Sequence, residues 1–282
     1  IQLELSDHNR KRIDFATSGP LTEKGLYYAM SGFYRYDEGP IDTGIPTEGY
    51  QIRGNLHKDF SDGSGYFTVY GQAIDDEVQF FLPLPLDADT RERLPGNNGD
   101  EVESTQTVNA SGLSYDTATG RYRSPIDEGV ATSGGSISME FSKELGNDYS
   151  ILARAKYADY DHQFNLFLDG DGLVNVPETQ ADYLFNRGYG DAQSAAFTYA
   201  GTNIALADDD LVFANRILDR DRPVTDFSSE LNLIKYFYVG DFSHSVTVGT
   251  FFSSSEAEDN NVTSRYLSGF NNQARLVDVQ IT

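Results

Sequence analysis

The chain has 282 residues, among them no cysteine and no tryptophan, and its 44 acidic and 21 basic residues give a net charge of −23. The lack of cysteine excludes disulfides, thiolate metal sites and cysteine nucleophiles, and the acidic balance argues against a nucleic-acid partner, because phosphate binding needs clustered Lys and Arg. No run of about 18 apolar residues occurs, which excludes an all-helical membrane protein.

The sequence predicts about ten long β-strands in which polar and apolar residues alternate. The segment Gly135–Leu145 shows this clearly, since Ser136 and Ser138 alternate with Ile137 and Met139. Globular strands average about five or six residues, whereas a tilted strand that crosses a bilayer needs about 9–11. In chain order we expect strands at Ile1–Asp7, Arg12–Gly19, Gly25–Tyr36, Gly49–Asp59, Gly65–Ile74, Gly135–Leu145, Tyr149–Asp161, Thr225–Tyr238, Phe242–Ser253 and Arg275–Thr282.

Short turns and long polar stretches alternate between these strands, except that the Asp7–Lys11 connection, on the long-loop side, is short. The turns are Leu21–Lys24, Phe60–Ser64, Gly146–Asp148 and Val239–Asp241. The long stretches are Asp37–Glu48, Asp75–Gly134, His162–Val224 and Ser254–Asn272. Short turns at one rim and long loops at the other are typical of an outer-membrane barrel, and aromatic residues near both strand ends indicate girdles at the membrane interfaces.

Two stretches carry a resemblance to a known family. Residues 18–44 read SGPLTEKGLYYAMSGFYRYDEGPIDTG, and residues 50–86 read YQIRGNLHKDFSDGSGYFTVYGQAIDDEVQFFLPLPL. Their order and spacing resemble the barrel of TonB-dependent outer-membrane receptors. The resemblance implies an all-β fold, an antiparallel transmembrane β-barrel with long extracellular loops. Such barrels have about 22 strands, so we expect residues 1–282 to be an internal segment, a partial barrel without the plug domain and the remaining strands.

The same resemblance implies a function. The protein would actively take up a scarce nutrient of siderophore, haem, vitamin or glycan type across the outer membrane of a Gram-negative bacterium. Its expected partners are outer-membrane lipid, the small-molecule nutrient and the TonB energy-transducing complex, which acts through the plug. It would be no enzyme and would need no cofactor.

Seven apolar residues in a row, 80–86, follow the fifth expected strand. Pro83 and Pro85 bar a continued ladder strand. The segment either folds over the barrel mouth, presenting apolar surface to a ligand or to the plug, or packs against neighbouring loops. Under the first interpretation, the residues of the binding vestibule are Phe80, Phe81, Leu82, Tyr160 and His162.

Side chains on the polar strand faces would line the lumen wall. The resemblance implies that they contact the plug or an anionic ligand. Pairing with Glu140 or Glu230 is the more common role of charges on a barrel wall, and we favour it. The residues predicted to face the lumen are Arg53, Gln72, Arg154 and Lys156.

No other motif indicates catalysis or metal binding. Asp169–Gly172 begins like a calcium loop, but Glu178 comes too early for the EF-hand pattern, so we interpret the segment as a solvated acidic turn. The four histidines form no H-x-x-x-H pair, and no G-x-S-x-G elbow occurs. We therefore predict no catalytic residue and no metal site.

Two other classes of protein fit the pattern. One is a smaller complete barrel that acts as a passive outer-membrane channel or adhesin. The other is a secreted soluble carbohydrate-binding β-protein, with calcium held in its acidic loops. The soluble fold would cover the apolar strand faces with a second packed layer, whereas a membrane barrel would leave them exposed, and the residues that decide are Ile137, Met139, Phe141, Val246 and Val248.

Overall fold

The computed structural model describes residues 1–79, 86–94, 106–168, 176–190, 195–271 and 273–281, with only the backbone for 166–168. This part of the chain is all-β and antiparallel, as expected, apart from the single-turn helix η1 (Val108–Ala110) and the helix α1 (Gln180–Asn186). Neither helix is long and apolar enough to cross a membrane.

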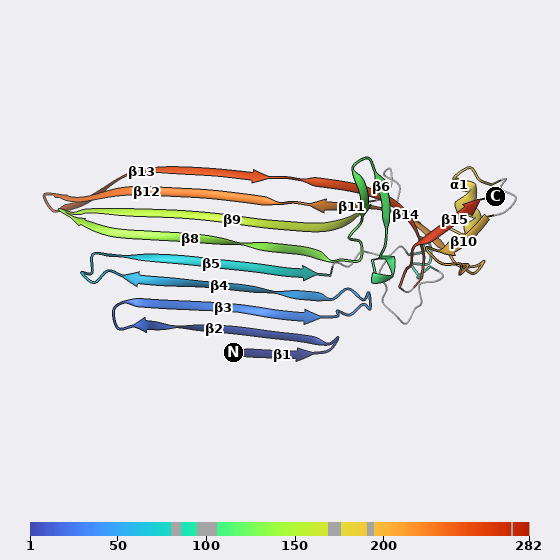
Figure 1. Ribbon diagram of the computed structural model, residues 1–282, viewed down its shortest axis with the longest axis horizontal. Coiled ribbons are helices and arrows are strands. Elements are labelled where there is room, and N and C mark those ends of the chain that lie inside the picture. Colours follow the sequence, from blue (N-terminus) through green and yellow to red (C-terminus); the bar gives the residue numbers. More distant parts are fainter. Residues whose placement is uncertain (80–85, 95–105, 169–175, 191–194, 272, 282) are drawn as a thin grey trace.

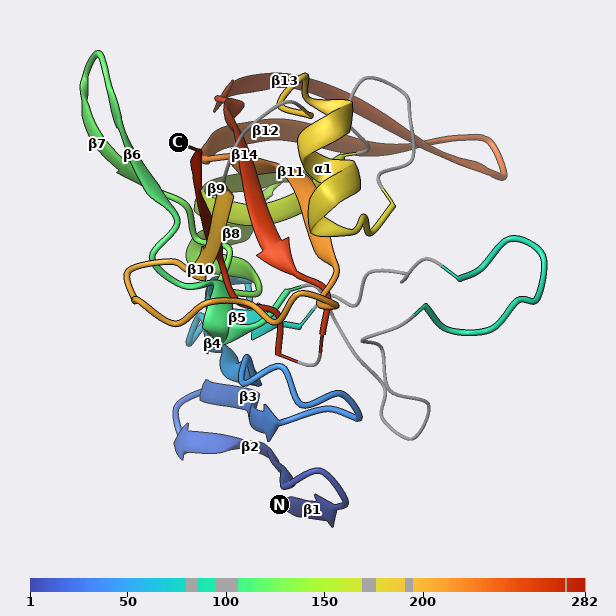
Figure 2. The same ribbon diagram turned by 90° about the vertical axis from the view of Figure 1, so that its right-hand side faces the viewer.

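Eleven strands form one antiparallel sheet, in which the first seven lie side by side in chain order (Figure 1). The last four form two hydrogen-bonded pairs that follow one another along the seventh strand. Viewed along the strands, the sheet curves like an open trough (Figure 2). Within the described residues β1 pairs only with β2, so no closed barrel is seen. The strands are β1 (Gln2–Ser6), β2 (Arg10–Thr22), β3 (Leu26–Asp37), β4 (Thr47–Asp59), β5 (Gly65–Val78), β8 (Val130–Gly146), β9 (Tyr149–Leu168), β11 (Val212–Asp221), β12 (Val224–Val239), β13 (Phe242–Ala257) and β14 (Asn260–Gly269).

The long strand β9 carries the sheet beyond the length predicted from the sequence. Its first part pairs with β12, and its last six paired residues, Gln163 to Leu168, pair with β11. β11 and β12 thus follow one another along β9, interrupted at Arg222 and Pro223, where proline offers no N–H for the ladder. β14 continues β13 in the same way and pairs with β11. The expectation that these stretches are loops was wrong.

Two small sheets lie at the loop end of the large one. β6 (Ser114–Thr117) and β7 (Gly120–Arg123) form a hairpin, and β10 (Ala195–Tyr199) pairs with β15 (Val277–Ile281). The prediction that Arg275–Thr282 adds a strand to the barrel was wrong. Val277 instead packs into a buried cluster with Phe197 and Leu206, which holds β15 on β10.

Tight turns close the opposite end of the sheet. Asn147 and Asp148 have φ values of 53° and 62°, the two left-handed residues that a two-residue hairpin turn needs to match strand twist. Lys235, which lies on the apolar face, reaches this turn. Its ammonium donates to the carbonyl of Asn147, lies 3.7 Å from the Asp148 carboxylate and sits over the ring of Tyr149. The lysine stem thus crosses apolar surface while its charge stays at the edge of the apolar band.

One face of the sheet is apolar and uncovered. Cross-strand pairing places Val69, Met139 and Ala155 in one row, and Leu233 opposite Val248. Ile137 is 52% exposed and Val248 is 68% exposed. Over the described residues, the second layer expected of a soluble sandwich does not cover these side chains.

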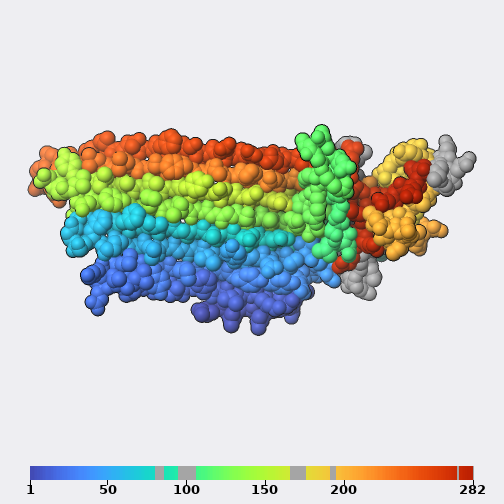
Figure 3. Space-filling model, viewed as in Figure 1, coloured from blue at the N-terminus to red at the C-terminus, as the bar shows by residue number. Residues whose placement is uncertain are grey.

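The buried hydrophobic clusters lie at the loop end instead. One gathers Val212 and Leu267 with the β10–β15 pair, and the other gathers Ile126, Ile217 and Tyr266. The β6–β7 hairpin lies across the sheet at this end (Figure 3). The molecule therefore has a packed cap, residues 106–129 and 195–221 with β14 and β15, and a long sheet whose apolar face has no internal partner.

A glycine inside β8 lets the strand bend close to β9. Gly134 has a φ of 127°, and a Cβ there would lie 2.2 Å from the backbone oxygen of Asp159. We expect Gly134→Val to lower the free energy of unfolding by about 1–3 kcal/mol, because the strained backbone and the clash add. The urea midpoint measures this. Gly71→Val is the matched control, since its Cβ meets open space, and an equal loss in both variants would contradict the explanation.

Candidate functional site

The polar face of the sheet brings the predicted lumen residues together. Arg53 lies opposite Gln72 across β4 and β5, and Gln72 lies opposite Ser136 on β8. In the adjacent row Ser138 lies opposite Lys156. Side chains of directly opposed residues share a face, so these rows form one surface.

β9 supplies four of the predicted residues at alternate positions. A strand turns every second side chain to the same side. This periodicity places the four on the polar face, in the order Arg154, Lys156, Tyr160 and His162 from the turn end to the loop end.

A groove of about 660 Å³ runs along this face. Small side chains leave the space, among them Ala29, Ser31, Ser136 and Ser138. Larger polar residues border it. These are Arg53, Asn55, Tyr70, Gln72 and Lys156.

The two cations in this groove have no acidic partner within the part of the chain that the structure describes. Arg53 donates to the side-chain oxygen of Gln51 at 2.8 Å. Lys156 forms no ion pair within 4 Å among the described residues, although Glu140 and Glu230 line a neighbouring hollow with it. Among the residues that the structure describes, no Asp or Glu lines the groove. The pairing that we predicted does not occur at Arg53 or Lys156.

Arg154 behaves as predicted. Its Nε lies 2.7 Å from Glu140 Oε2 and its Nη1 lies 3.8 Å from Glu230 Oε2. Both carboxylates also accept from neutral groups, Glu140 from the Tyr66 hydroxyl and Glu230 from the Asn232 amide, each at 2.5 Å. This network borders a second hollow of about 250 Å³, and Tyr70, Ser138 and Lys156 line both this hollow and the groove.

Tyr160 and His162 lie where the polar face meets the cap. The Gln72 amide donates to the Tyr160 hydroxyl at 3.4 Å, which links the groove to this rim. His162 Nδ1 lies 2.8 Å from Thr132 Oγ1, and its ring packs 5.5 Å from that of Phe164. Both vestibule residues that the structure describes therefore share the polar face with the lumen residues.

An arginine pair that we did not predict borders the same rim. Arg220 and Arg222 lie 5.6 and 5.3 Å from the centre of the Phe164 ring. Both also contact Asp259, at 2.6 and 3.3 Å. Their hydrogen bonds hold the pKa of the Asp259 carboxyl well below its usual range. The sequence spacing does not reveal this cluster, because Asp259 is 37 residues from Arg222.

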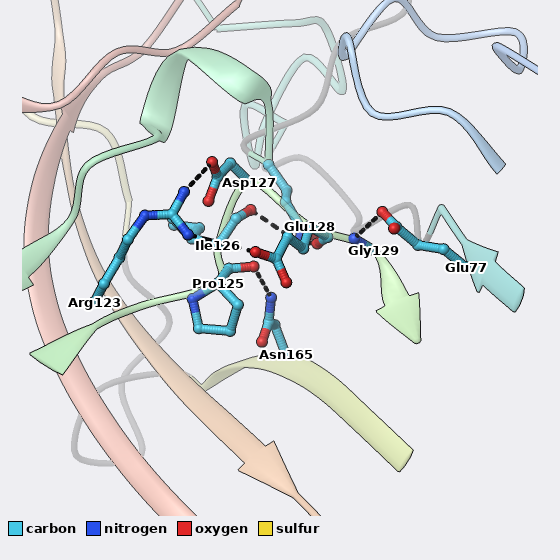
Figure 4. A network of polar contacts seen from close by, with 9 residues as sticks. Glu77, Arg123, Pro125, Ile126, Asp127, Glu128, Gly129 and Asn165 are labelled. Carbon is cyan, nitrogen blue, oxygen red and sulfur yellow. Dashed lines mark hydrogen bonds and ion pairs between the residues drawn. The ribbon is translucent and has the colours of Figure 1, made fainter. Parts of the chain in front are cut away.

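Polar contacts tie the long connection between β5 and β8 to the strand ends (Figure 4). The backbone N–H of Gly129 donates to Glu77 at 2.8 Å, and the Asn165 amide donates to the carbonyl of Pro125 at 2.8 Å. Arg123 pairs with Asp127 at 2.6 Å. The described part of this loop is therefore built onto the sheet.

A buried carboxylate lies beneath the β6–β7 hairpin. Asp219 is 4% exposed and accepts a hydrogen bond of 2.8 Å from the Tyr122 hydroxyl. Burial raises the pKa of Asp219, and burial with the nearby carboxylate raises the pKa of Tyr122. Sequence reasoning missed this pair because both residues lie in stretches that we interpreted as long polar loops.

The remaining predictions lie beyond what the structure describes. Phe80, Phe81 and Leu82 fall outside the described residues, as does Asp169–Gly172. No cluster of three or more His, Asp or Glu side chains suited to a metal ion occurs among residues that are described. No protein-family model matches the chain, and no curated protein matches its sequence.

Proposed function

We propose that the chain is part of the barrel of a TonB-dependent outer-membrane receptor that actively takes up a scarce nutrient. In this proposal the apolar face contacts outer-membrane lipid and the polar face lines the lumen. The cap lies on the extracellular side. Siderophore, haem, vitamin and glycan ligands all remain within the proposal.

One observation supports this best: the two faces of the same long strands differ in polarity, and the apolar one is uncovered. On β4 the apolar face runs from Tyr50 to Lys58, which is nine residues, the length of a tilted membrane strand. The aromatic Tyr50 lies at one end of this stretch and the charged Lys58 at the other. The polar face of the same strand borders the groove through Arg53 and Asn55.

The open sheet also favours part of a wide barrel over a small complete one. A passive channel or adhesin barrel of eight to ten strands would have to close on itself. Here β1 and β13 do not pair among the described residues.

Uptake measurements test the function. Cells that carry the protein should accumulate one labelled nutrient from a panel of ferric siderophores, haem, cobalamin and oligosaccharides, and a disruption strain should not. Accumulation should stop when a protonophore collapses the inner-membrane gradient, because the proposed receptor draws energy from TonB. Uptake that continues with the protonophore would instead support the passive channel.

A further inference from the structure

Three lysines lie on the apolar face of the sheet, where this face meets the tight turns. They are Lys58 on β4, Lys143 on β8 and Lys235 on β12, which are alternate strands of the sheet. The residues two positions earlier, on the same face, are apolar: Leu56, Phe141 and Leu233. Among the described residues, no Asp or Glu occupies the apolar face at this end of the three strands.

The sheet register places the three lysines at one level of a tilted barrel. Lys58 shares a row with Phe141, and Lys143 lies two residues closer to the turns. Lys143 in turn shares a row with Leu233, and Lys235 lies two residues closer to the turns. A step of two residues, about 7 Å, for every two strands, about 10 Å, corresponds to a strand tilt of about 35°. Membrane barrels have tilts of about 35–45°, so the lysines would lie at one depth, roughly 12 Å apart.

The opposite edge of the apolar face carries the opposite charge. The residues ten positions earlier on the three strands, each with its cross-strand partner, are Glu48 with Glu77, Ser133 with Asp161, and Thr225 with Glu256. Lys11 lies in the row of Glu48, where these four carboxylates outnumber it. Ten residues of a strand tilted by about 35° span about 28 Å, close to the hydrocarbon thickness of about 30 Å. The two charged edges are therefore one membrane thickness apart.

Local contacts hold the three ammonium groups at the edge of the apolar face. Lys58 donates to a backbone carbonyl in the turn between β2 and β3. The Lys143 ammonium lies 5.1 Å from the centre of the Phe60 ring, and the Lys235 ammonium lies 4.3 Å from that of Tyr149. Lysines whose stems cross apolar surface, beside aromatic rings, are typical of the level at which lipid headgroups begin.

Carboxylates of the turns offset this charge only in part. Asp148 lies 3.7 Å from the Lys235 ammonium, and Asp62 interacts electrostatically with Lys143. Both acids are exposed, and water screens exposed ion pairs. An ammonium group has three donors, so each lysine can also bind an acceptor on the lipid side.

The chemistry of the row matches the phosphate of an anionic phospholipid. Lysine binds phosphate as a point charge, and cations beside a bilayer are attracted to anionic lipid. A zwitterionic headgroup carries its own cation, which the lysines would repel. At the other edge the carboxylates would repel an anionic headgroup.

We infer that Lys58, Lys143 and Lys235 form a docking row for anionic phospholipid headgroups in the leaflet next to the tight turns. This inference rests on the proposed function, because it names the class of lipid that contacts one rim of the proposed barrel.

Spin-labelled lipids test the inference on the intact protein in phosphatidylcholine vesicles. Electron paramagnetic resonance measures the fraction of each label that the protein immobilises. Labelled phosphatidylglycerol should associate about twofold to fivefold more strongly than labelled phosphatidylcholine, since one lysine near an anionic surface contributes up to about fivefold and only some lipid positions adjoin a lysine. The preference should disappear in about 1 M salt, which screens charges beyond about 3 Å.

Variants of two lysines separate charge from packing. Lys58→Gln with Lys143→Gln should lower the preference about twofold or more, and Lys58→Arg with Lys143→Arg should keep it. The matched control is Arg91→Gln with Arg121→Gln, which removes two exposed cations from the loop end and should leave the preference unchanged. A preference that persists in the glutamine variant would refute the role of the row.

The lipid measurements also separate the inference from the proposed function. Equal immobilisation of both labelled lipids would overturn the inference and leave the membrane barrel standing. If neither label is immobilised, the protein does not contact lipid and both proposals fail. Inorganic phosphate at constant ionic strength should not reduce the preference, and a reduction would assign the lysines to a soluble anion instead of a lipid surface.

Discussion

Val248→Arg is expected to destabilise the protein in lipid vesicles by about 2–4 kcal/mol, the cost of a cation on the lipid face of a membrane barrel near its midplane. Thr247→Arg is the matched control. The two residues are neighbours on β13, both are exposed, and they point to opposite faces. The urea midpoint of vesicle-bound protein measures the difference.

The comparison with this control tests whether lipid or water contacts each face of the sheet, and does not depend on how the side chains pack. In water both substitutions would change stability by no more than about 0.5 kcal/mol, because neither side chain is covered. The two variants should therefore differ in stability only if lipid contacts one face of the sheet and not the other. Equal tolerance of both arginines would remove the basis for a membrane barrel and with it the proposed receptor.

The second large effect concerns the cap, where stability should fall as the pH rises above about 4. Burial raises the pKa of Asp219 above its ordinary value of 3.8. At a pH between the ordinary pKa and the raised pKa of the folded state, Asp219 is protonated in the folded cap and ionised in the unfolded chain. Raising the pH through this interval therefore lowers the free energy of unfolding, until Asp219 is ionised in both states. Asp219→Asn should flatten this dependence and still accept the hydrogen bond from Tyr122.

Thermal unfolding followed by the near-UV circular dichroism of tyrosine, from about pH 4 to about pH 7, measures the effect. Tyr122→Phe should lower the free energy of unfolding by about 1–3 kcal/mol, and by more at the higher pH, because it leaves a buried carboxylate without its donor. Asp259 acts in the opposite sense, since its lowered pKa adds stability that is lost only at more acidic pH. An unchanged pH profile in Asp219→Asn would contradict the assignment.

Alternation of polar and apolar residues was enough to predict the long strands. β4 begins two residues before the expected Gly49 and ends at the expected Asp59, because its pattern runs unbroken between charged ends. The same periodicity placed Arg53, Gln72, Arg154 and Lys156 on one face. The face on which a side chain lies depends only on its position along the strand, so it can be predicted without knowledge of tertiary contacts.

The cap escaped prediction because its strands do not alternate in the same way. β11 buries Asn215 and Asp219 beside Ile217, so its polar residues read as loop. β14 buries Ser264 and Ser268 for the same reason. These strands are stabilised by contacts with distant segments, such as the hydrogen bond of 2.9 Å between the hydroxyls of Tyr115 and Ser264. Such contacts produce no periodic pattern in the sequence.

β13 hydrogen-bonds only to β12 within the described residues, and every one of its 16 residues is exposed. Half of its backbone amides and carbonyls therefore face outward, and in a bilayer each unmet group costs several kcal/mol. If the proposed membrane barrel is correct, these groups would have to pair with a further strand. That strand would have to place apolar residues opposite Val246 and Val248, because a register shift of one residue would turn its polar side toward the lipid.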